Sequence, residues 1–114
     1  MTDAANMLPV LKQSLLFRNM EDREILEALE TIASHRRVYP KRTLVMRDGD
    51  PMDQVGVILS GNLHIFHIDA NGNSNLMEEL GAGEAIGLLN AIGGYRLHIS
   101  AEATEETEIL FLNV

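Results

Sequence analysis

Three histidines are the residues of this chain whose chemistry could bind a metal ion or a haem iron: His64, His67 and His98. Imidazole nitrogen is a common ligand of zinc, copper and iron. His64 and His67 lie three residues apart in an extended run, so we expect their side chains on opposite faces of a strand, unable to chelate one ion. A single axial haem ligand from one of the three stays open. The chain has no cysteine, which excludes a Cys-ligated iron–sulfur cluster in it.

The sequence offers no nucleophile–base pair for catalysis. Ser60 and Ser100 have no catalytic motif around them, and Ser60 precedes Gly61 in an expected turn. We interpret the acidic residues between 102 and 108 as a solvated strand edge that resists pairing. We therefore predict that the chain is not an enzyme. A small metal-dependent barrel enzyme remains the alternative of a different class, and a bound transition metal would distinguish it.

Length and charge limit what the chain can bind. Its 114 residues show no break in composition, so we predict one domain spanning residues 1–114. Its 17 acidic residues outweigh 9 basic ones, for a net charge of −8, which would repel the phosphate backbone of DNA or RNA. The apolar part of residues 7–17 is interrupted by Lys12 and Gln13, and it is too short for a membrane span or a secretion signal. We expect a soluble, cytoplasmic protein without a membrane partner.

Two helices and a set of short strands should build the domain. Helical spacing of apolar residues predicts helices over residues 7–17 and 22–35, with Pro9 in the first turn of the first helix and His35 at the end of the second. From Val38 onward the apolar residues alternate with period two, as in strands. Asn71-Gly72 predicts a hairpin turn, and residues 85–92 suggest one or two helical turns. The expected strands are residues 38–39, 44–46, 55–59, 63–68, 76–80, 97–103 and 108–112.

The order of these short motifs resembles the N-terminal sensor domain of the Crp/Fnr family of bacterial transcription regulators. The resemblance covers about residues 11–112. It rests on Leu16-Phe17, Tyr39-Pro40-Lys41, Gly49-Asp50, Ile58-Leu59-Ser60-Gly61, the turn at 69–72, Gly83-Glu84-Ala85-Ile86-Gly87 and residues 103–109. It implies a mainly β fold with flanking α-helices, a double-stranded β-helix (jelly-roll-like) barrel that takes an effector inside. It also implies a homodimer that binds promoter DNA through a C-terminal helix-turn-helix domain, absent from this chain.

The resemblance also indicates where an effector would bind. In relatives that bind cyclic AMP, a Gly-Glu pair holds the ribose hydroxyl, and an Arg followed by Ser or Thr neutralises the cyclic phosphate. Here Gly87 matches the glycine, but Leu88 stands at the Glu position and Leu97 or His98 at the Arg position. Arg96 lies near, but off register. The stretch is more similar to the gas-sensing branch of the family, which leaves haem as a cofactor option.

We therefore predict an effector-sensing regulatory domain that does not bind cyclic AMP in the usual way, with an effector that the sequence does not name. Three alternatives remain open. The domain could bind a cyclic nucleotide through Arg96, sense a gas through haem, or serve as a degenerate barrel without a ligand. The predicted effector contacts are Ile65, Gly87, Leu88, Leu89, Arg96, Leu97 and His98.

Overall fold

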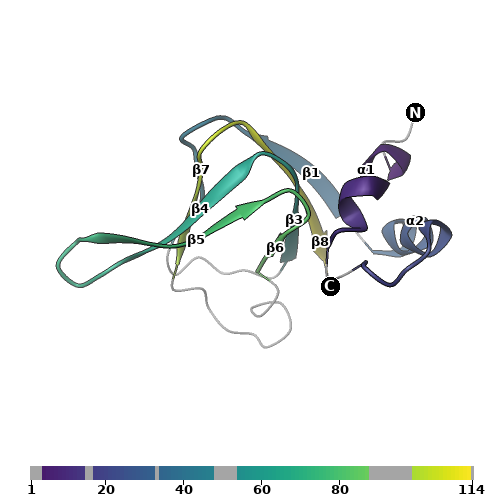
Figure 1. The fold of residues 1–114 in the computed structure, drawn as a ribbon, viewed down its shortest axis with the longest axis horizontal. Helices are drawn as coiled ribbons and strands as arrows, with labels where there is room; N and C mark the ends of the chain where they lie inside the picture. The colour runs from purple at the N-terminus through teal and green to yellow at the C-terminus, as the bar shows by residue number, and fades with distance from the viewer. Residues whose placement is uncertain (1–3, 15–16, 33, 48–53, 88–98, 114) are drawn as a thin grey trace.

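Two four-stranded antiparallel sheets face each other, and two short helices lie at one side of them (Figure 1). This arrangement comes from a computed structural model, which describes residues 4–14, 17–32, 34–47, 54–87 and 99–113. The first sheet has the order β1-β8-β3-β6 and the second the order β2-β7-β4-β5. The predicted mainly β, jelly-roll-like fold with flanking helices is confirmed.

Strands from opposite ends of the chain pair in both sheets. In the first sheet, β1 pairs along its whole length with β8, and β3 lies between β8 and the short β6. In the second, β7 lies between β2 and β4, while β4 and β5 form a long hairpin that projects from the barrel (Figure 1). The strands are β1 Ser34–Tyr39, β2 Leu44–Met46, β3 Gln54–Ser60, β4 Asn62–Ile68, β5 Ser74–Gly81, β6 Ala85–Ile86, β7 Ser100–Ala103 and β8 Thr107–Asn113.

The two sheets differ in what covers them, and their sequences reflect that difference. The helices pack on the outer face of the first sheet, where Leu11, Phe17 and Ile25 join Val57 and Leu110 in one apolar cluster. A strand buried on both faces needs apolar residues at every position, and β3 is accordingly buried at four consecutive positions from 55 to 58. In β4 the buried residues alternate with more exposed ones, as expected for a sheet with one face toward solvent.

The helices differ from the predicted ones at their ends. The first, α1 (Ala4–Leu11), starts earlier than expected, so Pro9 lies inside it and not in its first turn. The second, α2 (Asp22–Thr31), begins with a reciprocal capping box between Glu21 and Glu24. It ends at Thr31 and not at His35, because the chain extends from Ile32 into β1.

Pairing between distant segments explains the wrong boundary of α2. Residues 34–39 each lie opposite a residue of β8, and the resulting strand overrides the local helical pattern. His35 therefore belongs to a strand and not, as predicted, to the end of a helix. The prediction for residues 85–92 is wrong in the same way at Ala85 and Ile86, which pair with β3; residues 88–92 lie outside the described part.

The interpretation of residues 102–108 as an edge also needs correction. Glu102 lies in β7 and Glu108 in β8, and both strands have a neighbour on each side. Glu108 accepts a hydrogen bond of 2.9 Å from Nε of Arg36 across the β1–β8 pair. The predicted hairpin turn at Asn71-Gly72 is confirmed, with Gly72 at a φ of 84°, and so is the predicted strand over residues 44–46.

Candidate effector site

The space between the two sheets is lined by apolar side chains. Ile58, Ile109 and Phe111 of the first sheet face Leu63 and Ala101 of the second in a single buried cluster. The buried polar residues of the described chain are Ser14, Ser100 and Thr107. Every charged group in that part of the chain is at least partly exposed. These side chains pack against one another as the hydrophobic core of the barrel, and among the described residues no buried charged group is present that could pair with an ion. The cluster consists of Tyr39, Met46, Ile58, Leu63, Ile65, Leu80, Ile86, Ala101, Ala103, Ile109 and Phe111.

Two of the seven predicted effector contacts lie in the described residues, and both are buried. Ile65 is 5% exposed and stands on the inner face of β4, opposite Ala101 of β7. Gly87 follows β6 directly and has a φ of 84°, a conformation that side chains with a Cβ rarely adopt. A glycine there lets the chain leave the sheet sharply toward residues 88–98.

The turn that precedes Gly87 is held firmly on the barrel wall. The N–H of Gly83 donates to the carbonyl of Ile58 (2.8 Å), and the N–H of Ile58 donates to the carbonyl of Glu84 (2.9 Å). The N–H of Gly81 also donates to a side-chain oxygen of Glu84 (3.0 Å). Glu84 thus closes its own turn. The acidic residue of the Gly83–Gly87 motif has a structural use at the base of the predicted effector segment.

The other five predicted contacts are Leu88, Leu89, Arg96, Leu97 and His98, and they lie outside the described residues. Their predicted roles stay predictions. The described chain resumes at Ile99, which packs against the inner cluster. Gly87 and Ile99, the described residues on either side of this stretch, both belong to the barrel.

None of the three described histidines belongs to the buried cluster between the sheets, although His35 lies on the inner face of β1. His64 is on the outer face of β4, where its Nε2 lies 2.9 Å from Oε2 of Glu79 on the neighbouring β5. His67 is exposed, and His35 stacks on the ring of Phe111 with centroids 5.3 Å apart. Among the described residues, no group of three or more His, Asp or Glu side chains could hold a metal ion. The β4–β5 pair contains a register shift between Ile65 and Phe66, but its extra residue is Met77 of β5, so the bulge is not in the strand that carries His64 and His67.

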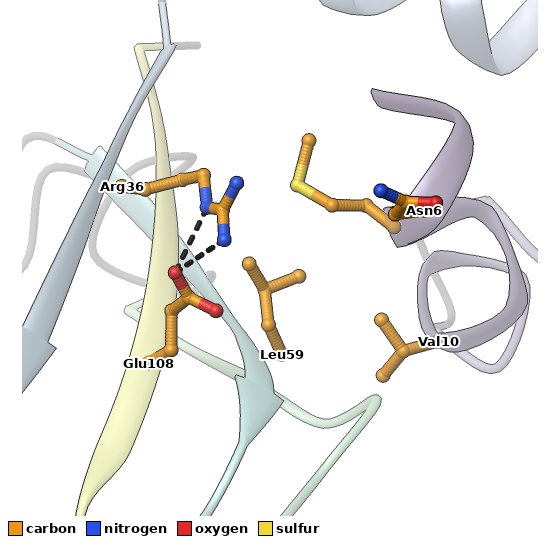
Figure 2. Close-up of a pocket in the computed structure, with 6 residues that line it drawn as sticks. Asn6, Val10, Arg36, Leu59 and Glu108 are labelled. Carbon is orange, nitrogen blue, oxygen red and sulfur yellow. Dashed lines mark hydrogen bonds and ion pairs between the residues drawn. The ribbon is translucent and has the colours of Figure 1, made fainter. Parts of the chain in front are cut away.

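A hollow of about 230 Å³ lies outside the barrel, beneath α1. Figure 2 shows Arg36 and Glu108 on one side of it, Asn6 and Val10 of α1 on the other, and Leu59 between them. The ion pair between Arg36 and Glu108 already neutralises both charges. This hollow is separate from the buried cluster between the sheets and from Ile65 and Gly87, the two predicted effector contacts that the structure describes.

Sequence reasoning missed two polar residues on the inner face of β1. His35 and Arg37 lie opposite Phe111 and Ile109, and directly opposed residues of antiparallel strands share a face. The Arg37 guanidinium carbon lies 5.3 Å from the ring centroid of Tyr39. Burial raises the pKa of the Tyr39 phenol, and the positive charge of Arg37 opposes that rise. The sequence signal for this face is the spacing of residues 35, 37 and 39, which share one side of a strand. The prediction that the second helix reaches His35 hid this pattern.

The described residues thus form a small two-sheet barrel with an apolar core, and the chain passes from β6 to Gly87 with a positive φ. A family model described as "Cyclic nucleotide-binding domain" matches residues 36–114. The chain belongs to this family, which is a family of regulatory binding domains.

The relatives agree with that assignment. The chain is 29% identical over 102 residues to the cyclic AMP receptor protein of Thermus thermophilus, covering 90% of this chain and 46% of the relative. It is 37% identical over 54 residues to the CRP-like protein Clp of Xanthomonas campestris, covering 47% of this chain and 24% of the relative. The chain therefore spans less than half the length of these relatives. The predicted resemblance to Crp-type regulators is confirmed.

Solved structures show the same fold. The catabolite activator protein of Thermus thermophilus superposes with a TM-score of 0.77 at 28% identity, covering 86% of this chain and 45% of that one. The regulatory domain of Toxoplasma gondii PKA, in a co-crystal with cAMP, gives a TM-score of 0.84 at 18% identity, covering 97% of this chain and 41% of the other. Among the described residues, no helix has the length and apolarity required to span a membrane.

Proposed function

We propose that this chain is the effector-sensing domain of a Crp/Fnr-type transcription regulator that acts in the cytoplasm. The family match over residues 36–114 carries this proposal. In it, a small-molecule effector binds inside the barrel, and a helix-turn-helix domain outside this chain binds promoter DNA as part of a homodimer. The domain itself has no catalytic role.

We further propose that the effector is not cyclic AMP bound in the usual way. A cyclic phosphate carries one negative charge, and burying that charge without a paired cation costs several kcal/mol. Leu88 stands where a carboxylate would accept a hydrogen bond from the ribose hydroxyl, and Leu97 or His98 stands where a guanidinium would meet the phosphate. Each kcal/mol lost lowers the affinity about fivefold, since about 1.4 kcal/mol corresponds to a factor of ten. An effector with a larger apolar body suits the residues at these positions.

Calorimetric titration with cyclic AMP and cyclic GMP tests this proposal. We expect no binding with a micromolar Kd to the 114-residue chain. A double variant, Leu88→Glu with His98→Arg, restores the two missing groups and should gain affinity for cyclic AMP. Leu89→Glu with His98→Arg is the matched control, since it adds the same charges but places the carboxylate one residue away from the matched position. Micromolar binding of cyclic AMP to the natural sequence would overturn the proposal.

The two alternative functions, cyclic AMP binding through Arg96 and gas sensing through haem, each predict a distinct experimental result. If Arg96 supplies the cation, the natural sequence binds cyclic AMP and Arg96→Ala abolishes the binding. If the domain senses a gas through haem, purified protein supplemented with haemin shows a sharp Soret absorbance band that His98→Ala removes. His64 is the weaker candidate ligand, because its ring contacts Glu79 on the outer face of the barrel.

A further inference from the structure

The hollow between α1 and the outer face of the first sheet lies where the packing between them changes. At the C-terminal end of α1, Leu11 belongs with Val57 and Leu110 to one buried apolar cluster. Next to that cluster, the sheet presents the ion pair of Arg36 and Glu108 toward the helix (Figure 2). A charged pair does not pack against a helix as apolar side chains do, and the hollow of about 230 Å³ lies at this point.

The lining of the hollow combines an ion pair, an amide and an aliphatic surface. Its members come from α1, β1, β3 and β8, and they are Asn6, Met7, Val10, Arg36, Leu59 and Glu108. The aliphatic side chains of Met7, Val10 and Leu59 are each partly exposed. Because apolar surface in contact with water favours an apolar group in place of that water, this part of the lining suits an aliphatic body.

The ion pair of the hollow can be approached by a ligand. The side chains of Arg36 and Glu108 are 34% and 24% exposed. Nε and Nη2 of Arg36 both donate to Oε2 of Glu108, and Figure 2 shows the other carboxylate oxygen on the side of Leu59. The pair has no net charge, so an anion or a cation alone would meet one attractive and one repulsive group. A molecule with one charge of each sign would meet an attractive group at each end.

The volume of the hollow limits the ligand to a small molecule. Pockets for drug-sized ligands have about 300–1,000 Å³, and this hollow has about 230 Å³. A nucleotide or a haem is therefore too large for it. Glycine would satisfy the charges but would leave the aliphatic lining in contact with water. A zwitterion with a branched aliphatic side chain matches both parts of the lining.

We propose that the hollow beneath α1 is a second ligand site of this domain and binds a small aliphatic α-amino acid such as leucine. The ammonium group donates to Glu108, while the carboxylate accepts from Arg36 and from the amide of Asn6. A guanidinium has five N–H donors, enough to serve Glu108 and a second carboxylate together. The side chain of the ligand lies against Val10 and Leu59. Every charge then has a partner of opposite sign, as partly buried charges require. This site lies outside the barrel and does not depend on the effector binding proposed above.

Four small probes test which parts of the ligand the hollow recognises. L-Leucine carries both charges and the aliphatic body, 4-methylpentanoate lacks the ammonium, 3-methylbutylamine lacks the carboxylate, and glycine lacks the side chain. In titrations followed by NMR, we expect L-leucine to bind the 114-residue chain with a Kd of about 1 mM, as for other small ligands in open sites. Each of the other probes should bind about tenfold more weakly or less, because it leaves part of the lining without a partner.

The same titration locates the ligand. The amide signals of Val10, Leu59 and Glu108 should shift as L-leucine is added, and those of Ile65 and Gly87 should not. Shifts centred on Ile65 and Gly87 would mean that the amino acid binds inside the barrel, and they would overturn the assignment of the hollow.

Three variants separate the contributions of shape and charge. Val10→Phe should fill the hollow and abolish binding, whereas the control Leu76→Phe introduces the same side chain at a position of β5 that is 60% exposed, and it should bind as the natural sequence does. Glu108→Gln removes the partner of the ammonium while Arg36 keeps its charge. It should therefore weaken L-leucine binding about tenfold and remove most of the preference over 4-methylpentanoate. Thermal unfolding without ligand shows that each variant is folded.

The proposal has definite points of failure. It is overturned if L-leucine does not bind, or if 4-methylpentanoate, 3-methylbutylamine or glycine binds as tightly as L-leucine. It is also overturned if Val10→Phe and Leu76→Phe have the same effect, or if Glu108→Gln leaves the preference for L-leucine over 4-methylpentanoate unchanged.

Discussion

Gly83 and Gly72 each form a turn with a positive φ angle, but the two turns have very different surroundings. Gly83 (φ 90°) is buried against the barrel, and a Cβ placed on it would lie 2.8 Å from Cβ of Gln13. Gly72 (φ 84°) lies at the tip of the β4–β5 hairpin, where a Cβ would meet nothing within 4 Å. One turn is held by segments distant in sequence, and the other is held by its own residues.

The hydrogen bonds make the same distinction. At the hairpin tip, Asp69 accepts from the N–H groups of Asn71 and Asn73 (both 2.9 Å), and the N–H of Gly72 donates to the carbonyl of Asp69. At the barrel wall, the turn at Gly83 depends on the carbonyl and N–H of Ile58, some 25 positions earlier. A local turn should therefore tolerate a Cβ at the cost of backbone strain alone, while a turn in tertiary contact should also lose packing.

Gly61 is the most crowded of the described turns and should show the largest effect. At a φ of 99°, a Cβ would lie 2.6 Å from the carbonyl oxygen of Glu106 and from Cα of Thr107. Backbone atoms cannot move aside as a flexible side chain can. We expect Gly61→Ala to lower the free energy of unfolding by about 3–5 kcal/mol, combining strain with overpacking. Urea denaturation measures this loss, and a value below 1 kcal/mol would contradict the geometry.

Gly83→Ala should have an intermediate effect. Strain contributes roughly 1–2 kcal/mol, and the overlap with Gln13 adds about 1 kcal/mol, because the Gln13 side chain can move in part. A double-mutant cycle with Gln13→Gly separates the two terms: the variants should couple by about 1 kcal/mol. The same cycle between Gly72→Ala and Gln13→Gly is the control and should show no coupling. Additive losses at Gly83 would mean that Gln13 does not press on this turn.

Gly72→Ala should cost the least of the three glycine substitutions. Since no atom lies near the added methyl group, strain alone should remain, roughly 1–2 kcal/mol. Gly72→Asn should cost less than Gly72→Ala, because asparagine tolerates a positive φ better. Thermal or urea unfolding of the two variants provides the measurement. A loss at Gly72 as large as that at Gly61 would remove the distinction between local and tertiary turns.

The contrast also explains which parts of the fold could be predicted from the sequence. Asn71-Gly72 predicts its turn correctly, because the hydrogen bonds of that turn come from residues 69–73. The alternation of β4 predicts which of its side chains are buried, Leu63 and Ile65 among them. The order of short motifs also predicts the family. The turn and the strand can be predicted because the interactions that determine them are between residues close in sequence. The family can be predicted because its members share this order of motifs.

Residues 34–37 could not be placed in this way, although the strand over residues 38–39 was predicted correctly. The helical spacing of α2 continues as far as His35, and only the pairing with β8, about 70 positions later, determines that Ser34–Tyr39 is one strand. The same long-range pairing brings Arg37 to the inner face of β1, opposite Ile109. The candidate effector site is divided similarly. The burial of Ile65 follows from strand alternation, and the position of Gly87 follows from the glycine motif. The roles of Arg96 and His98 depend on contacts between residues 88–98 and the barrel, and they stay predictions.

The self-contained hairpin tip makes one further prediction, on pH. The pKa of Asp69 is lowered, chiefly by the hydrogen bond from the backbone N–H of Asn73 and further by that of Asn71. A lowered pKa means that the folded hairpin favours the carboxylate. Its contribution to stability is therefore present above the usual Asp pKa of about 3.9 and is lost as the pH falls through the lower, folded value.

Titration of the Asp69 carboxyl carbon by NMR should accordingly give a midpoint below 3.8, the ordinary value for this group. Asn73→Ala keeps the backbone donor and removes only the side-chain donor, so most of the shift should persist. In contrast, Asn73→Pro removes the backbone N–H that contributes most and should move the midpoint upward toward the ordinary value, while the donors at Asn71 and Asn75 keep part of the shift. Because these donors belong to residues 71–75, neither Gly83→Ala nor Gln13→Gly should move the midpoint. A shifted Asp69 midpoint in either variant would show that the barrel wall affects the hairpin tip, and that the tip is not an independent turn.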